Sequence, residues 1–312
     1  MLNKFNELNI RENINEDYIY LIEPVDSNSG FYLHQKKIVF ISRQSHDEKK
    51  EINDVSTDHL RLVMGVSIKA IQGDPYFKEG LFNMLYYDGD YSIEEIDVFQ
   101  SLCRLYIENQ ETMSFSEFFH LIRNLFNKTK ETEKIEGLGL FGELSIIYRA
   151  FTKYGVDLSK YWHKNGIYSK YDFIIGDLAY EIKTSTSSNY EYKIKHDQIF
   201  GSERIFIGTV SIQNNENGIT IRQLVSNIKE IPDFYNNIKF MINLEKSLLN
   251  IKRSEENSYY VDEVRVYDSH EIKTIDILSD GVTNISYNYN FSNQNYITEE
   301  KFINEVLRTK LI

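Results

Sequence analysis

Residues 171–184 read YDFIIGDLAYEIKT, and this stretch decides the expected fold. Two apolar runs flank Gly176–Asp177, a pattern typical of two β-strands joined by a tight turn. Glu181 and Lys183 are two positions apart on the second strand. The alternation of a strand therefore places both side chains on one face, while Ile182 points the other way into the core. The stretch predicts a hairpin that presents an acidic and a basic side chain side by side.

Asp172 stands at the head of the first strand and is expected to face Glu181 across the hairpin. Two carboxylates that meet at one point suit Mg²⁺, which binds one or two carboxylates and keeps several waters; Mn²⁺ is an alternative. Lys183 beside such an ion would orient the attacking water and offset charge in the transition state. The E-x-K triplet occurs five times in the chain, so the preceding aspartate and turn single out this one.

The stretch GLGLFGELSIIYRAF at 137–151 predicts a helix. Its apolar stripe runs from Leu140 to Phe151 at spacings of four, three and four residues. Glu143 lies beside this stripe and not on the opposite polar face. A carboxylate in that position is costly unless it is paired, protonated or bound to a metal. Glu143 therefore either belongs to the same site or forms a buried salt bridge, for example with Arg149.

Three short motifs together, Gly142–Glu143, Asp172–Phe173 and Glu181–Thr184, resemble those of the PD-(D/E)XK nuclease superfamily. The chain is most similar to the bacterial family labelled "PD-(D/E)XK motif protein". Gln198 matches a glutamine that often follows on the next helix in that superfamily. The part of the chain that carries the resemblance is about 137–212.

The resemblance implies a restriction-endonuclease-like fold and Mg²⁺-dependent hydrolysis of DNA phosphodiester bonds by an endonuclease. It also implies a restriction or phage-defence setting, in which protein partner subunits or a homodimer are expected. Tyr171 stands where the motif name has proline. That proline ligates nothing, so the departure leaves the chemistry untouched.

Each expected site residue has a stated role. Lys183 would position the water, and Glu143 and Gln198 would complete or orient the metal shell. The expected metal ligands are Asp172, Glu181, the main-chain carbonyl of Ile182, and Glu143. The expected catalytic residues are Glu143, Asp172, Glu181, Lys183 and Gln198.

The segment 190–204 places basic side chains among tyrosines. This mixture suits phosphate contacts combined with base stacking, although an ordinary solvated strand has the same pattern. The candidate DNA-binding residues are Lys193, Lys195, His196 and Arg204.

The expected fold class is α/β (α+β), with a core of a mixed sheet flanked by helices. We expect a β-rich and then helical region at 1–130, the nuclease core at 135–230, and a helix followed by a β-rich region at 231–312. The charged stretch 127–136 is the best candidate boundary. From about 55 to 127 the apolar spacing predicts mostly helix.

The composition is that of a folded globular protein, because 41% of the 312 residues are hydrophobic. The single cysteine, Cys103, excludes an internal disulfide and a cysteine zinc site. The net charge of −12 counts against a nucleic-acid coat protein but not against a nuclease. The polar N-terminus has no signal-like apolar region, and no apolar run approaches the about 20 residues of a membrane span. We therefore expect a soluble cytoplasmic protein without membrane contact.

Two other functions stay open from the sequence. A nuclease-like subunit could keep the fold and work by holding DNA or a protein partner. A nucleotide-binding regulator rests only on Gly137, Gly139 and Gly142, which match G-x-G-x-x-G. The charged stretch before these glycines is not the apolar strand that a dinucleotide site requires, so close helix packing is the preferred interpretation.

Overall fold

The chain forms two compact units, Met1–Glu133 and Lys134–Ile312. The computed structural model describes residues 1–9, 15–44, 54–89, 91–123, 125–126, 137–162, 170–187, 189–199, 204–249, 251, 257–272 and 285–311.

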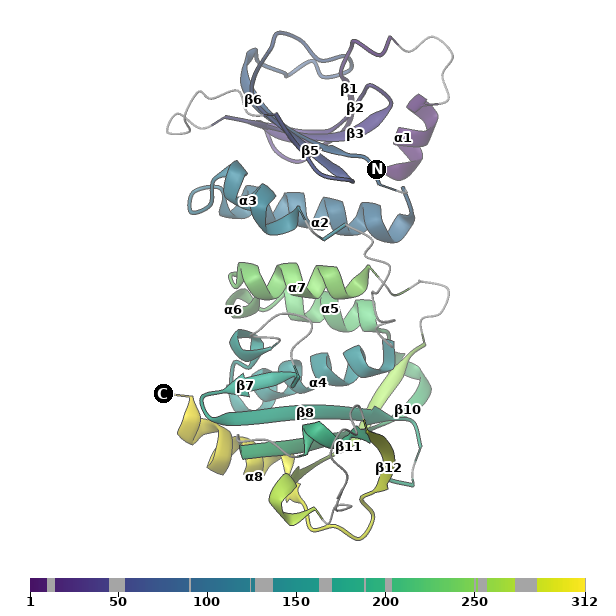
Figure 1. Ribbon diagram of the computed structural model, residues 1–312. Coiled ribbons are helices and arrows are strands. Elements are labelled where there is room, and N and C mark those ends of the chain that lie inside the picture. Colours follow the sequence, from purple (N-terminus) through teal and green to yellow (C-terminus); the bar gives the residue numbers. More distant parts are fainter. Residues whose placement is uncertain are drawn as a thin grey trace. The chain divides into compact units, whose positions relative to one another are not determined.

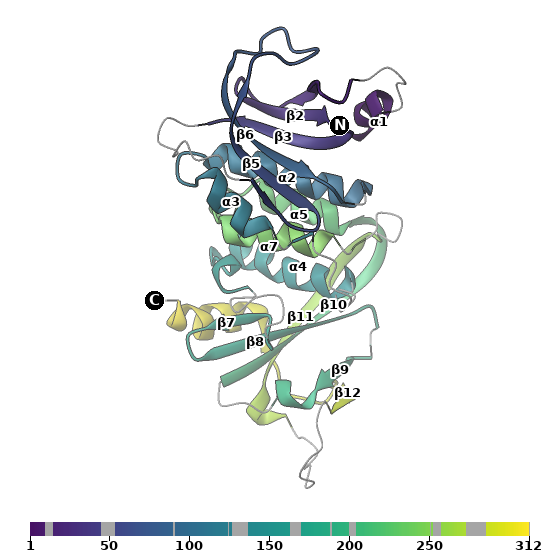
Figure 2. The same cartoon turned by 45° about the horizontal axis from the view of Figure 1, so that its top comes forward.

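The first unit is built on a six-stranded antiparallel sheet with the strand order β1-β2-β3-β6-β5-β4 (Figures 1 and 2). A bulge interrupts the pairing of β5 with β6, where Gly65 adopts a positive φ of 71°. The strands are β1 (Tyr20–Pro24), β2 (Ser29–His34), β3 (Lys37–Arg43), β4 (Asp54–Ser56), β5 (Leu60–Ile68) and β6 (Gly80–Tyr87).

The helices of this unit are α1 (Leu2–Asn9), α2 (Ile93–Asn109) and α3 (Phe115–Ile122). Ser92 caps α2, and Ser114 caps α3 in a capping box. Helices α2 and α3 cover one face of the sheet through aromatic contacts such as Phe31–Phe99 and Phe40–Phe115.

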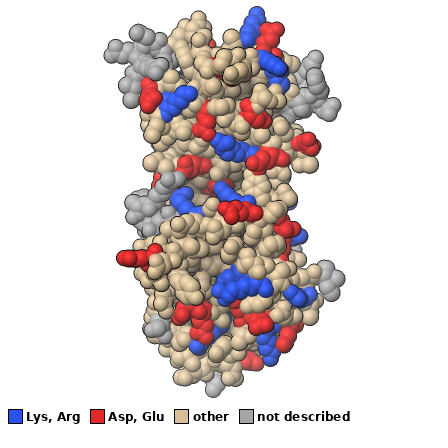
Figure 3. Space-filling view, turned by 180° about the vertical axis from the view of Figure 1, so that it is seen from behind, with Lys and Arg blue, Asp and Glu red and all other residues tan. Residues whose placement is uncertain are grey.

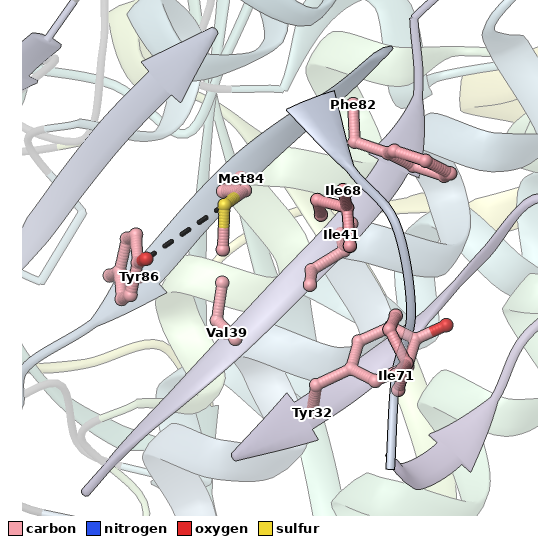
Figure 4. Packing of buried hydrophobic residues seen from close by; sticks show 8 residues of the cluster. All are labelled: Tyr32, Val39, Ile41, Ile68, Ile71, Phe82, Met84 and Tyr86. Atoms are coloured by element: carbon pink, nitrogen blue, oxygen red, sulfur yellow. Dashed lines mark hydrogen bonds between the residues drawn. The ribbon is translucent and has the colours of Figure 1, made fainter. Parts of the chain in front are cut away.

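The opposite face of the sheet carries its own apolar cluster, which we call the inner-face cluster (Figure 4). Five of its eight side chains come from alternate positions of β3 and β6, so they project from the side that α2 and α3 do not cover. The members are Tyr32, Val39, Ile41, Ile68, Ile71, Phe82, Met84 and Tyr86.

The expectation of mostly helix from about residue 55 is wrong for β4, β5 and β6. Leu60, Met64 and Ile68 have the four-residue spacing of a helix stripe, yet they lie on a strand. Strand β6 is buried on both faces, because helices cover one and the inner-face cluster the other, so its residues do not alternate between apolar and polar. Tertiary burial here overrides the local period.

The second unit contains a five-stranded mixed sheet with the order β13-β11-β10-β8-β7. Strand β8 runs parallel to β10, and the other neighbours are antiparallel. Strands β11 and β13 lie beyond residue 230, yet they belong to this same sheet. The strands are β7 (Phe173–Ile175), β8 (Leu178–Ser185), β10 (Arg204–Ile219), β11 (Tyr259–Asp268) and β13 (Ile297–Thr298).

Helix α4 packs directly on one face of this sheet, and α5 and α7 lie on the far side of α4 (Figure 1). Phe302 packs on the same face, between Tyr180 and Phe206. The helices are α4 (Gly137–Tyr154), α5 (Ile221–Lys229), α6 (Pro232–Tyr235), α7 (Ile238–Leu248) and α8 (Glu299–Lys301), with a π-helix at Phe302–Leu307.

The other face of the five-stranded sheet is covered by a separate two-stranded sheet, β9 (Glu191–Lys195) with β12 (Ser286–Asn290), visible in Figure 2. Tyr192 and Ile194 of β9 pack against Ile207 and Tyr267 of the larger sheet. The helix η2 (His196–Gln198) follows β9 on this face.

The expected α+β class with a mixed sheet flanked by helices is confirmed. In the part of the chain that the structure describes, no helix has both the length and the apolar character needed for a membrane span.

We expect Arg149→Met to lower the free energy of unfolding of the second unit by about 3 kcal/mol, because a buried charge loses its partner. Arg149 Nε donates to Glu299 Oε1 at 2.9 Å and ties α4 to α8. Lys301→Ala is the control, since its ion pair with Glu305 is exposed and should contribute less than about 1 kcal/mol. Urea unfolding followed by the fluorescence of Trp162, the only tryptophan, measures both. Equal midpoints for the two variants would contradict the expectation.

Candidate active site

Glu181, Lys183 and Gln198 form a closed hydrogen-bonded group on the face that β9 covers. The Lys183 ammonium donates to Glu181 Oε1 at 2.5 Å and to Gln198 Oε1 at 3.0 Å. The Gln198 amide donates to the same Glu181 oxygen at 2.7 Å and to the carbonyl of Lys170 at 3.2 Å. Strand alternation brings the first two together, and η2 delivers the glutamine. The sequence-predicted residues therefore meet, although 15 positions separate Lys183 from Gln198.

Asp172 lies at the point where the sheet edge opens. The pairing of β7 with β8 begins at Phe173 and Tyr180, so beyond that pair β8 has no neighbouring strand on this side among the described residues. The main-chain N–H of Ile182 would be left unpaired there, and it donates to Asp172 Oδ2 at 2.6 Å. The aspartate therefore stands beside Glu181 and closes the edge of the strand.

Glu143 reaches this edge from α4, and its neighbour Gly142 explains how. A Cβ added at Gly142 would lie 1.8 Å from Thr184 Oγ1, so only glycine lets the helix approach β8 this closely. Glu143 Oε2 accepts a hydrogen bond from the Trp162 indole at 2.8 Å. Trp162 is buried, and its main chain forms an isolated β-bridge with Phe173. It therefore anchors the join between helix and strand.

Arg149, named as a possible salt-bridge partner in the alternative interpretation of Glu143, pairs with Glu299 instead. The glycine pattern around Gly142 serves helix packing, as preferred from the sequence. Among the described residues no strand precedes α4 directly in the second unit.

The three carboxylates affect one another. Burial, followed by repulsion from Glu143 and Glu181, holds the pKa of Asp172 well above the ordinary aspartate value, against the opposing effects of the Ile182 N–H and Lys183. Burial also raises the pKa of Glu181, although Lys183 and Gln198 oppose this and Glu143 adds to it. A site with so much uncompensated negative charge gains from a cation.

The donor set fits a divalent cation that takes few protein ligands. Glu181 Oε2 is buried and accepts no hydrogen bond within the described part of the chain. No three Asp, Glu, His or Cys side chains of the described residues are grouped so as to hold a metal by themselves. The arrangement therefore suits an ion such as Mg²⁺, which completes its shell with water and main-chain oxygens, and not a zinc centre with three or four side-chain ligands.

The candidate DNA-binding residues do not form one group. Lys193 and Lys195 are exposed on the outer side of β9, and the half-buried His196 follows them with its ring 6.1 Å from that of Tyr287. Arg204 lies at the other end of β8, beside Leu178, where it pairs with Asp268. On the face seen in Figure 3, basic and acidic side chains are interspersed.

Sequence reasoning did not single out Arg265. The strand registers place Lys183, Thr209 and Arg265 in one row across three strands, so their side chains share the site face. The Arg265 guanidinium lies over the ring of Tyr190 at 4.0 Å and over that of Tyr296 at 4.5 Å. It is far from the motif in the chain and outside the expected core, so spacing alone offered no signal for it.

We expect Gly142→Ala to destabilise the second unit by about 1–3 kcal/mol, because the new methyl group forces α4 away from Thr184. Gly139→Ala in the same helix is the matched control, since nothing lies within 4 Å of its added Cβ and alanine favours a helix. Urea unfolding compares the two, and Thr184→Gly should rescue the first variant. Equal stability of both alanine variants would show that the close approach is not required.

Comparison with protein families matches residues 3–292 to the family described as "Putative PD-(D/E)XK family member, (DUF4420)". The match includes both units and every candidate site residue. Comparisons with curated proteins and with solved structures gave no match. The chain therefore belongs to this PD-(D/E)XK family, which suggests a nuclease.

Proposed function

We propose that this protein is a metal-dependent endonuclease that hydrolyses DNA phosphodiester bonds. The observation that carries the proposal is the group of Glu181, Lys183 and Gln198 beside Asp172, in which one buried carboxylate oxygen has no hydrogen-bond partner among the described residues. A purely structural ion pair would not need a second and a third carboxylate nearby, because each raises the free energy of the others.

Asp172 and Glu181 would hold Mg²⁺, or Mn²⁺ in its place, with the carbonyl of Ile182 as a further ligand and Glu143 completing or orienting the shell. When bound, the ion would polarise a phosphoryl oxygen and lower the pKa of its water. Lys183 then has two roles. Its ammonium orients the attacking water, and it offsets the charge that develops on the phosphate.

Gln198 would fix the direction of Lys183. Its amide oxygen accepts from Lys183 Nζ at 3.0 Å, while its amide nitrogen holds Glu181 and the Lys170 carbonyl. A lysine held by two partners loses less conformational freedom when it reaches for the substrate. The phosphates on either side of the scissile one would be contacted by Lys193, Lys195 and His196. Arg204 would contact the DNA backbone at a point further from the scissile phosphate.

The substrate would be DNA. The protein would work in a restriction or phage-defence system of the cytoplasm, with protein partner subunits or as a homodimer. The net charge of −12 supports partners, since the long-range field of the chain repels a polyanion. A second function, a subunit that holds DNA or a protein without cutting, is favoured by one observation. Lys183 and Gln198 already occupy Glu181 Oε1, so the site is closed without a metal.

Lys183→Ala should reduce cleavage of plasmid DNA in Mg²⁺ to the background seen with EDTA, because the residue acts on the transition state. The second unit should stay folded although Glu181 loses its ion-pair partner, because Gln198 still donates to the same carboxylate oxygen. Lys160→Ala is the control, because its side chain is 67% exposed outside the site. A gel assay of supercoiled plasmid measures both variants. Cleavage by Lys183→Ala at the wild-type rate would exclude a catalytic role for this lysine.

Compared with the wild type, Asp172→Asn should be at least as stable without metal and less stable with metal. Without metal the variant should be at least as stable as the wild type, because a repelling charge is gone while the amide oxygen still accepts from Ile182. With Mg²⁺ at 100 times its dissociation constant, the wild type alone should gain about 2.7 kcal/mol. Urea unfolding with Mg²⁺ and with EDTA measures this. An equal effect of Mg²⁺ on both proteins would place metal binding elsewhere.

A further inference from the structure

The first unit carries a pocket of about 460 Å³ on the face of the β1–β6 sheet that α2 and α3 leave uncovered. This volume is in the range of small-ligand sites. Its floor is apolar and comes from the inner-face cluster and its neighbours, chiefly Val63, Val66, Ile68 and Met84. Figure 4 shows Met84 and Ile68 among the side chains of the cluster. A flat apolar ligand would rest on this floor.

Polar side chains gather at one end of the pocket. The hydroxyl of Tyr86, whose residue is 5% exposed, lies 2.7 Å from His34 Nδ1. Burial lowers the pKa of His34, so its ring is neutral near pH 7. Nδ1 is engaged by the Tyr86 hydroxyl, so Nε2 is the ring nitrogen that would meet a ligand. Gln35 and Gln72 line the pocket with amides, which also donate and accept.

The pocket is not an anion site, although Arg61 lines it. The Arg61 guanidinium is already held by both carboxylate oxygens of Asp54, at 2.9 Å and 2.6 Å. Asp17, an exposed carboxylate that also lines the pocket, disfavours an anion as well, so the group that enters should be neutral. Lys69 also lines the pocket and is exposed. It could bind a negatively charged group of the ligand that stays outside the pocket.

The turn at this end is strained. Gln35 and Lys36 have φ values of 51° and 60°, a conformation that two-residue hairpins usually give to Asn-Gly. The two-residue hairpin between β2 and β3 requires a positive φ at both central residues. Here it holds Gln35 at the edge of the pocket.

We propose that this pocket binds a nucleobase, either of a free nucleotide or of an unpaired position in the nucleic acid. A nucleobase has a flat apolar face for the floor and a neutral edge of alternating donors and acceptors for His34, Gln35 and Gln72. The choice of a nucleobase over another neutral heterocycle rests on the proposed nuclease function. The candidate active site lies entirely in the second unit, so this would be a separate recognition site.

The test measures binding by the full-length chain in EDTA, where no metal-dependent cleavage occurs. The probes are nucleoside monophosphates, whose binding is measured by calorimetry, and fluorescent single-stranded and duplex oligonucleotides, whose binding is measured by fluorescence anisotropy. We expect Tyr86→Phe and Gln72→Ala each to weaken binding about tenfold, as for the loss of one buried hydrogen bond. Gln110→Ala, an exposed glutamine at the end of α2, is the matched control and should bind as the wild type does.

The probes distinguish the two sources of the base. Monophosphates that bind as tightly as the single strand would identify a free nucleotide, and binding of the single strand alone would identify an unpaired base. Binding that Tyr86→Phe and Gln72→Ala leave unchanged, or no binding of any probe, would overturn the proposal. If cleavage fails but the pocket variants lose binding, only the nuclease proposal falls; if cleavage occurs but the pocket variants bind normally, only the pocket proposal falls.

Discussion

The burial of one carboxylate, that of Glu181, is the constraint on which the proposed site depends. The residue is 4% exposed, and a lone charge there would be costly. Lys183 and Gln198 compensate one of its oxygens and leave the other without a partner among the described residues. Because Asp172 and Glu143 add negative charge nearby, the group is incompletely balanced. That imbalance is what a divalent cation would relieve.

The fold creates the place where this imbalance arises. Strand β7 is short, so the edge of β8 opens just where Asp172 and Ile182 meet. Helix α4 approaches the same edge because Gly142 has no side chain to strike Thr184. A longer β7 would pair the edge with main chain and exclude the carboxylates. An alanine at position 142 would move the helix and Glu143 with it. The site therefore depends on one short strand and one glycine.

Local spacing in the sequence was enough to predict the hairpin and the side-by-side placement of Glu181 and Lys183. It was also enough to predict the family, and the match over residues 3–292 confirms that prediction. These features depend on residues close together in the chain. The first unit was harder, because β6 is buried on both faces and its pattern does not alternate. Arg265 was missed, since its place in one row with Lys183 and Thr209 depends on strand registers between segments about 80 residues apart. The roles of the site residues stay predictions.

A structure determined after soaking with Mn²⁺ would test the central claim most directly, because anomalous scattering locates the ion without assumptions. We predict one ion bonded to carboxylate oxygens of both Asp172 and Glu181, with metal–oxygen distances of about 2.1 Å. Glu181 Oε2 should then be one of the ligands. An ion found elsewhere, or an unchanged contact of Lys183 and Gln198 with Glu181 and no ion beside it at saturating Mn²⁺, would contradict the account. The group would then be a structural ion pair, and the chain a non-catalytic subunit.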